Sequence, residues 1–199
     1  MKRYGLDLSE HQARLINDDG FWEALMQSQF KDFIILRRGY GVSGTEDKAY
    51  KGLYNRAYEA GIRDISSYWF SYALSPADAV KEAEEYVRLT ENDGLGLNCM
   101  ILDFEDNSYW KKNGYTLSSS MANAHCSAFL DVLKAKNLNC AVYASQWVLQ
   151  HILDWRALGV AVWNAAYDLD DEIKAWMFQY TESQYIGNYG PFDANVVYG

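Results

Sequence analysis

Apolar and polar positions alternate along the chain in two rhythms. Short runs rich in β-branched and aromatic residues are separated by longer segments in which apolar residues recur every three or four positions, as on a helix that covers a core. The clearest of these helical stripes ends before Gly61 and consists of Tyr50, Leu53, Tyr54, Ala57 and Tyr58. The pattern therefore predicts a chain in which strands and helices take turns.

Eight strands and four longer helices are predicted. The strands are expected at 4–7, 33–38, 65–72, 100–103, 141–144, 160–164, 175–180 and 192–197. The helices are expected at 21–29, 50–60, 76–92 and 118–137. The third helix has the plainest boundaries, because Ser75 is a good N-cap, Pro76 suits the first helical position and Gly94 follows the end.

The spacing of the strands indicates how they are joined. Through the first five, the connections are too long for hairpins, so the strands should be parallel and the helices should be crossovers. After about Leu153 the gaps leave little room for full helices. About eight strands favour closure of the sheet into a barrel, because eight is the number at which side chains can fill the interior. The prediction is an α/β fold: a single irregular TIM-like β/α barrel with about five β/α units followed by about three mostly β units, in one domain over residues 1–199.

The composition and charge of the chain limit the classes of partner that it is expected to bind. The chain has 199 residues, 49% of them hydrophobic and 23% charged, which is typical of a soluble globular domain. Its net charge of −9 disfavours nucleic acid and anionic membrane surfaces. No apolar run approaches the ~20 residues of a membrane span, and no export signal is visible at the N-terminus. We expect a monomer that does not insert into membranes.

Metal and cofactor chemistry finds little support. The three cysteines are an odd number with spacings that fit no zinc pattern, and Cys99 and Cys140, beside apolar runs, are expected to be free core thiols. The three histidines show no metal-binding spacing. His125 and His151 fall in or near helical segments and are expected at the surface. We therefore predict neither a metal ion nor a cofactor.

Acidic residues gather where such a barrel carries its chemistry, at the C-terminal ends of the strands. They are Asp7, Asp103, Glu105 and Asp193. Alternate strand residues point the same way, so Asp103 and Glu105, roughly 6.6 Å apart along the strand, can reach one substrate bond while Phe104 faces the other layer. Two such carboxyl groups beside apolar walls supply an acid and an anion at one pH, as cleavage of a glycosidic bond requires.

Aromatic residues are also abundant near the predicted strand ends. The chain has 16 tyrosines and seven tryptophans. Flat rings with polar edges can stack on sugar faces and hydrogen-bond at their rims. Any single ring is better explained as core, but the set favours a sugar-binding groove. Its members are Tyr68, Trp69, Tyr72, Tyr109, Trp110, Tyr143, Trp163, Tyr167, Trp176 and Tyr180.

Taken together, these segments resemble glycoside hydrolase family 25, the Chalaropsis-type lysozymes that include phage endolysin catalytic domains. The resemblance covers nearly the whole chain and depends on the order and spacing of its pieces. GLDLSEHQ is similar to the opening motif of the family, and DFIILRRGYG to its second strand. The later matches are ILDFE, VYAS, VAVWNAAY, MFQY and FDANV.

The resemblance implies 1,4-β-N-acetylmuramidase activity, the hydrolysis of the MurNAc–GlcNAc bond of bacterial peptidoglycan. It implies that Glu105 is the general acid and that Asp103 assists through the substrate acetamido group, with direct attack by Asp103 as the alternative. Asp7 and Asp193 would be the remaining acids of the groove, and Arg37 would point inward to balance them. The sugar subsites would be lined by Tyr68, Tyr143, Trp163 and Gln179.

The same resemblance implies action on the bacterial cell wall, outside the cell. Without a visible signal, release would be of the phage type, or the chain is trimmed. Many family members carry wall-binding repeats after the barrel, and this chain stops at the predicted closing strand. Two other functions stay open: a chitinase- or hexosaminidase-like glycosidase, which shares the logic of acids at strand ends, and a non-catalytic barrel that binds the cell wall.

Overall fold

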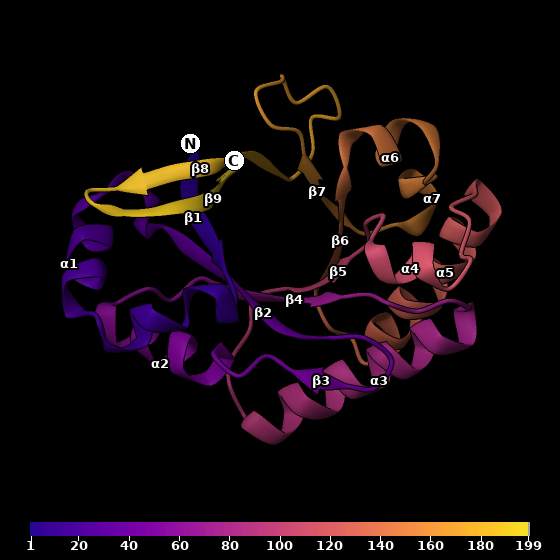
Figure 1. The fold of residues 1–199 in the computed structure, drawn as a ribbon, viewed down its shortest axis with the longest axis horizontal. Helices are drawn as coiled ribbons and strands as arrows, with labels where there is room; N and C mark the ends of the chain where they lie inside the picture. The colour runs from indigo at the N-terminus through magenta and orange to yellow at the C-terminus, as the bar shows by residue number, and fades with distance from the viewer. Residues whose placement is uncertain (199) are drawn as a thin grey trace.

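A computed structural model describes residues 1–198 of the protein. Eight strands close into a barrel because β1 pairs with β2 on one side and with β9 on the other (Figure 1). A two-residue strand, β3 (Thr45–Glu46), is added outside β2. The barrel strands are β1 (Arg3–Leu8), β2 (Phe33–Tyr40), β4 (Ile65–Phe70), β5 (Met100–Asp103), β6 (Cys140–Ser145), β7 (Ala161–Ala165), β8 (Met177–Ile186) and β9 (Tyr189–Val197).

Helices cover the outside of the first part of the barrel. In Figure 1, α1 and α2 lie at one end of the view, and α3 and α5 run along the lower and right-hand sides. The longer helices are α1 (Asp19–Gln27), α2 (Tyr50–Ala60), α3 (Pro76–Asp93) and α5 (Ser119–Ala135). The short ones are η1 (Glu10–Asn17), η2 (Gln29–Lys31), α4 (Ser108–Lys112), α6 (Gln146–His151) and α7 (Trp155–Leu158).

The helix ends follow the local chemistry of the sequence. The Ser75 side chain accepts a hydrogen bond from the Asp78 N–H and caps α3, with Pro76 at the first helical position. Gly94 ends α3 in the left-handed region at φ 62°, which a residue without Cβ adopts most readily. Gly61 ends α2 in the same way. The predicted boundaries of both helices are confirmed to within a residue or two.

The change of rhythm along the chain is confirmed as well. The neighbouring barrel strands from β1 through β8 run parallel, whereas β9 is antiparallel to both β8 and β1 and the short outer strand β3 is antiparallel to β2. No full helix separates β7, β8 and β9; Gly187 and Asn188 close a tight hairpin between the last two strands. That hairpin extends past the barrel over α1 (Figure 1). The predicted strand 65–72 ends at Phe70, and the connection that follows leads into the helix N-cap at Ser75.

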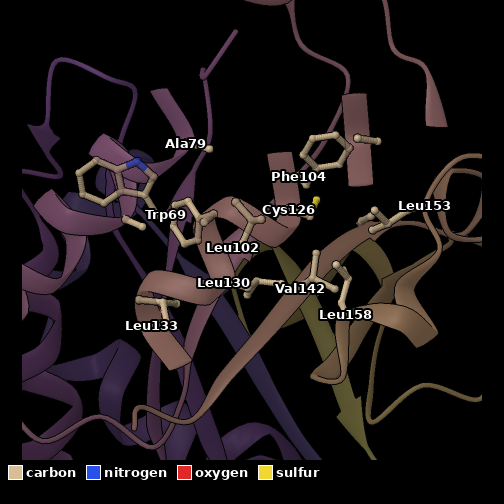
Figure 2. Packing of buried hydrophobic residues seen from close by; sticks show 14 of the residues in the cluster. Trp69, Ala79, Leu102, Phe104, Cys126, Leu130, Leu133, Val142, Leu153 and Leu158 are labelled. Atoms are coloured by element: carbon tan, nitrogen blue, oxygen red, sulfur yellow. The ribbon is translucent and has the colours of Figure 1, made fainter. Parts of the chain in front are cut away.

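Alternation along the strands sorts side chains into two apolar layers. On β5, Ile101 points into the barrel with Ile35, Ala141 and Met177. Leu102 points outward, into the layer beneath the helices. Figure 2 shows that layer, where Leu102 and Val142 from the strands meet α5. The remaining labelled members are Trp69, Ala79, Phe104, Cys126, Leu130, Leu133, Leu153 and Leu158.

Candidate active site

The inward positions at the C-terminal ends of the strands form a polar pocket of about 220 Å³. The alternation that sends Leu6 and Leu8 of β1 into the outer layer turns Asp7 into the barrel. On β5 the same alternation continues past the last strand residue, so Asp103 and Glu105 face the pocket while Phe104 packs under the helices. The predicted division of this triplet between two layers is confirmed.

Asp103 and Glu105 share a site with little water and few donors. Asp103 is 5% exposed, and its Oδ1 has no hydrogen-bond partner among residues 1–198. Burial raises the pKa of Asp103 well above its ordinary value, and the neighbouring charges of Glu105 and Asp7 raise it further. Burial also raises the pKa of Glu105, while a hydrogen bond shared with Asp103 opposes that shift. The pair therefore retains a proton under conditions in which isolated carboxyl groups have lost theirs.

Asp7 and Asp193 form the second pair of acids. They lie directly opposite each other in the antiparallel pairing of β1 with β9. The Oδ2 of Asp7 accepts hydrogen bonds from Asn195 Nδ2 at 2.8 Å and from Gln179 Nε2 at 2.9 Å. Burial and the charge of Asp193 raise the pKa of Asp7, whereas these two amide donors lower it.

Aromatic side chains hold those amides in place. The hydroxyl groups of Tyr143 and Tyr167 both donate to Gln179 Oε1, at 2.8 and 2.9 Å. The indole Nε1 of Trp163 donates to Asn195 Oδ1 at 2.8 Å. The rings of Tyr143 and Trp163 meet edge to face, with centroids 4.5 Å apart. A continuous network thus runs from the aromatic wall of the pocket, through two amides, to Asp7.

Arg37 reaches the pocket but takes different direct partners from those expected. Its Nε donates to Asp47 Oδ2 and its Nη2 to Glu10 Oε1, both at 2.8 Å. Asp47 also accepts the backbone N–H of Glu10, so the guanidinium group is fixed at the rim by the first residue of η1 and by the connection between β3 and α2. The charge of Arg37 still lowers the pKa of Asp103. Arg37 thus lies at the pocket, and its direct partners are Glu10 and Asp47 rather than the four pocket acids.

All nine residues singled out in the sequence line this one pocket: Asp7, Arg37, Tyr68, Asp103, Glu105, Tyr143, Trp163, Gln179 and Asp193. Residues that sequence reasoning did not assign to it also line it or support it, namely Ser9, His11, Gln12, Phe70, Asp47 and Asn195. For Asn195 a signal was present, since the alternation of FDANV places it on the same face as Asp193.

Several of the aromatic residues expected to form a sugar-binding groove do not line the pocket. Trp69 and Trp110 are fully buried in the layer beneath the helices. Tyr72 and Tyr109 stack with centroids 5.1 Å apart, beside Phe70, which lines the pocket. Only part of the aromatic surplus therefore faces the pocket.

One prediction about histidines is wrong. His125 is fully buried, because it lies on the apolar face of α5, whereas His151 is exposed as expected. Among residues 1–198, no three histidine, cysteine or acidic side chains converge in a way that could hold a metal ion. The three cysteines are free; Cys99 and Cys126 are buried and Cys140 is half-buried. Within the same residues, no helix has the length and apolar character of a membrane span.

A closed β/α barrel with paired acids at the ends of its strands is the arrangement of a glycoside hydrolase. Residues 6–189 match the family described as Glycosyl hydrolases family 25, and the chain belongs to that family. The predicted resemblance and the predicted barrel are confirmed. No curated protein sequence matches the chain.

Solved structures of similar fold include the modular autolysin LytC of Streptococcus pneumoniae, 25% identical with a TM-score of 0.84. The match covers 99% of this chain and 47% of LytC, so the chain spans about half the length of that autolysin. A Bacillus anthracis family 25 hydrolase is 20% identical over 99% of this chain and 89% of its own, with a TM-score of 0.76. The Streptomyces coelicolor lysozyme is 19% identical over 99% and 92%, also at 0.76. The last two establish likeness of fold.

Proposed function

We propose that this family 25 glycoside hydrolase is a peptidoglycan hydrolase, a 1,4-β-N-acetylmuramidase that cleaves the MurNAc–GlcNAc bond. The observation that carries the proposal is the proton-retaining pair of Asp103 and Glu105 in a pocket walled by aromatic rings. LytC, the neighbour described above, is known in complex with a synthetic peptidoglycan ligand. The substrate class is proposed on that likeness and on the family.

Glu105 acts as the general acid. It is more exposed than Asp103 and lines the pocket, so its carboxyl group can meet a glycosidic oxygen. Proton transfer to that oxygen lets the sugar leave as positive charge develops at the anomeric carbon. Asp103, buried beside it, orients the 2-acetamido group of the substrate, whose carbonyl oxygen attacks the anomeric carbon in a retaining reaction. Glu105 then accepts a proton from the water that completes hydrolysis.

The remaining pocket residues bind and orient the glycan. Asp7 and Asp193 are acceptors for sugar hydroxyl and amide groups on the far side of the pocket. Arg37, fixed by Glu10 and Asp47, supplies a cation at the rim. Sugar faces pack against the rings of Tyr68, Tyr143 and Trp163, and Gln179 holds the hydrogen-bond network behind them.

The test is a digest of purified Gram-positive peptidoglycan, with its products identified by mass spectrometry. Fragments with MurNAc at the reducing end are expected. Reducing-end GlcNAc would instead indicate hexosaminidase-like specificity, and a matched digest of chitin would reveal chitinase-like activity. Binding to insoluble walls with no released fragments would indicate the non-catalytic barrel.

Substitutions at two adjacent positions test whether the digest depends on the carboxyl group of Glu105. Glu105→Gln keeps the shape of the side chain but cannot donate the catalytic proton, and we expect its release of fragments to be about 10³-fold slower than that of the wild type. Asp106→Asn is the matched control, because Asp106 is exposed, pairs with Lys111 and does not line the pocket. Equal turnover by the two variants would reject the role proposed for Glu105.

We place the activity at the bacterial cell wall, where this substrate is found, and propose that the enzyme acts as a monomer. The pocket is formed by strands of one barrel, so the chemistry draws on a single chain. Light scattering at concentrations used for turnover should give the mass of one chain, 22.8 kDa. A larger mass under those conditions would contradict the monomer.

A further inference from the structure

A buried polar cluster lies behind the acid pair, on the helix side of the barrel wall. Its members are Ser71, just after β4, Glu82 on α3 and His125 on α5, each fully buried. The Ser71 hydroxyl donates to Glu82 Oε2 at 2.6 Å and lies 3.0 Å from His125 Nε2. Three side chains from three separate elements therefore meet at one hydroxyl group within an otherwise apolar layer.

The available donors set the directions of these hydrogen bonds. The single hydroxyl proton of Ser71 goes to Glu82, so Ser71 Oγ accepts from the Nε2–H of His125. Nδ1 of His125 then carries no proton, and it has no partner among residues 1–198. Burial lowers the pKa of His125 to about 4, so the ring is neutral, and burial raises the pKa of Glu82 to about 7.

The order of the three groups distinguishes them from a hydrolytic triad. In such triads the histidine lies between the nucleophile and the acid, so that it can take the proton of the nucleophile. Here the serine lies between the acid and the histidine. All three are also fully buried and do not line the pocket. The arrangement therefore favours a structural role for the cluster over a catalytic one.

What it holds is the segment that carries the two acids. The backbone N–H of Ser71 donates to the carbonyl oxygen of Asp103 at 3.1 Å. Nδ2 of Asn107 donates to the carbonyl oxygens of Ser71, at 3.2 Å, and of Glu105, at 3.1 Å. Phe104, between the acids, packs edge-on against the His125 ring, with centroids 5.3 Å apart. The cluster thus contacts Asp103 and Phe104 directly and is linked to Glu105 through Asn107.

We propose that Ser71, clamped between Glu82 and His125, is a positioning residue that fixes the relative placement of the Asp103 and Glu105 carboxyl groups. The inference rests on the proposed function, because it concerns the acids assigned to catalysis there. Through this clamp, α3 and α5 control the geometry of a pocket that neither helix lines. A displacement of 1 Å in a catalytic arrangement can cost on the order of 100-fold in rate.

Ser71→Ala is the first variant. It leaves Glu82 Oε2 and His125 Nε2 without their shared partner and frees the segment after β4. We expect kcat to fall about tenfold with KM changed less than about twofold, because the loss lies in placing the acids rather than in binding the sugar. The alkaline limb of the pH profile should move to lower pH, since two acids that drift apart repel each other less.

Ser67→Ala is the matched control. Ser67 is also fully buried on β4, and its hydroxyl lies 2.7 Å from the Tyr86 hydroxyl on α3. The change removes the same kind of hydrogen bond four residues earlier on the chain, without contact to 103–107. We expect a comparable fall in melting temperature, with kcat and the alkaline limb unchanged. A purely structural role for Ser71 would make the two variants alike.

Glu82 offers a conservative rescue. In Glu82→Gln the amide oxygen can still accept the backbone N–H of Tyr72, which Glu82 Oε1 accepts at 2.8 Å. The amide nitrogen can donate to Ser71, whose proton then turns to His125 in its other tautomer. We expect kcat within about twofold of wild type for Glu82→Gln, and a loss like that of Ser71→Ala for Glu82→Ala.

Glu82 is the titratable group that Ser71→Ala disturbs directly, and loss of the Ser71 hydrogen bond raises its pKa. An alkaline limb that moves to lower pH therefore reports the acid pair and not Glu82. The other titratable groups nearby are the same in Ser71→Ala and Ser67→Ala. Those facing the cluster are Asp78, Tyr115 and Cys126. Those facing the acid pair are Asp7, Arg37, Tyr68, Tyr72, Tyr143 and Asp193.

Two kinetic results would overturn the proposal: folded Ser71→Ala with wild-type kcat and pH profile, or Ser67→Ala with the same changes as Ser71→Ala. If Ser71→Ala does not fold, His125→Phe decides in its place, because its ring keeps the contact with Phe104 and loses only the hydrogen bond. Carboxyl ¹³C NMR titration of Asp103 and Glu105 needs no turnover. It should show a lower apparent pKa for the pair in Ser71→Ala even if the wild-type enzyme released no muramic ends, and an unchanged titration would contradict the clamp.

Discussion

The two acid pairs of the pocket are made of the same side chains and are held in opposite ways. Asp103 ends β5 and Glu105 lies two residues beyond it. Asp193 lies on β9, four strands away in either direction around the barrel, and Asp7 lies beside it on β1. Asp7 accepts two amide hydrogen bonds. Neither carboxyl group of the β5 pair accepts one from any amide among residues 1–198.

That difference in hydrogen-bond donors sets Asp7, whose carboxyl group is held in place by two amides, apart from Asp103 and Glu105. Burial raises the pKa of all four carboxyl groups. Only at Asp7 do amide donors act against it and favour the charged form. The net shift in the pKa of Asp7 is still upward, so what distinguishes Asp7 from the β5 pair is that two amide donors fix the position of its carboxyl group.

The largest expected effect tests this division directly. Glu105→Gln should lower kcat/KM by about 10³-fold, the scale of a lost general acid. Asp7→Asn keeps an oxygen that can accept a hydrogen bond from Asn195. Its fall in kcat/KM should therefore be about tenfold smaller than that of Glu105→Gln. Turnover of soluble peptidoglycan fragments measures both. Equal losses would mean that the two pairs share the proton chemistry and would end the comparison.

A smaller effect is expected from the amide that holds Asp7. Asn195→Ala removes one donor to Asp7 and the acceptor of the Trp163 indole N–H. KM should rise about tenfold with kcat changed less than about threefold, because a binding wall is loosened while the β5 pair is intact. Initial rates over a range of fragment concentrations give both constants. A fall in kcat alone would place Asp7 on the chemical step.

The smallest effect concerns stability. The pKa of Asp103 is raised in the folded state, so the fold binds its proton more tightly than the unfolded chain does. This contribution to stability is full below the ordinary value of 3.8 and is lost as pH rises through the folded pKa. Asp103→Asn should therefore raise the free energy of unfolding by about 1–2 kcal/mol at pH 8 and leave it nearly unchanged at pH 4.

Urea unfolding at the two pH values measures this gain, with Asp131→Asn as control. Asp131 is an exposed residue of α5 that pairs with Lys134, and its substitution should change little at either pH. A loss of stability in Asp103→Asn at pH 8 would show that the charge at this position is compensated in the folded state.

Much of the fold and the acid pair was predictable, because both depend on short-range periodicity. The two-residue alternation of Asp103, Phe104 and Glu105 is enough to divide them between layers. The hairpin also left a signal that we did not use: Gly187-Asn188 between two apolar runs is typical of a tight β-turn. Arg37 is different, because its partners are Glu10, at the start of η1, and Asp47, between β3 and α2, and no local pattern encodes the approach of these two segments.

At His125, the polarity of the residue predicts the wrong burial, whereas the helical spacing of its neighbours predicts the right one. It was expected at the surface because it is polar and helical. The buried stripe of α5 nevertheless includes its position, since Ala122, His125, Cys126 and Phe129 follow the three- and four-residue steps of one helix face. Its partners, Glu82 and Ser71, are 43 or more residues away in the chain and could not be read from that stripe.

The pairing of β1 with β9 has a consequence for when the enzyme becomes active. Asp7 and Asn195 are 188 positions apart, and the first strand finds its outer partner only when the last one exists. During synthesis, the pocket cannot be completed until the chain through β9 has left the ribosome. Contacts between such distant positions are also slow to form. A ribosome that stalls before β9 thus releases a chain whose pocket lacks Asp193 and Asn195.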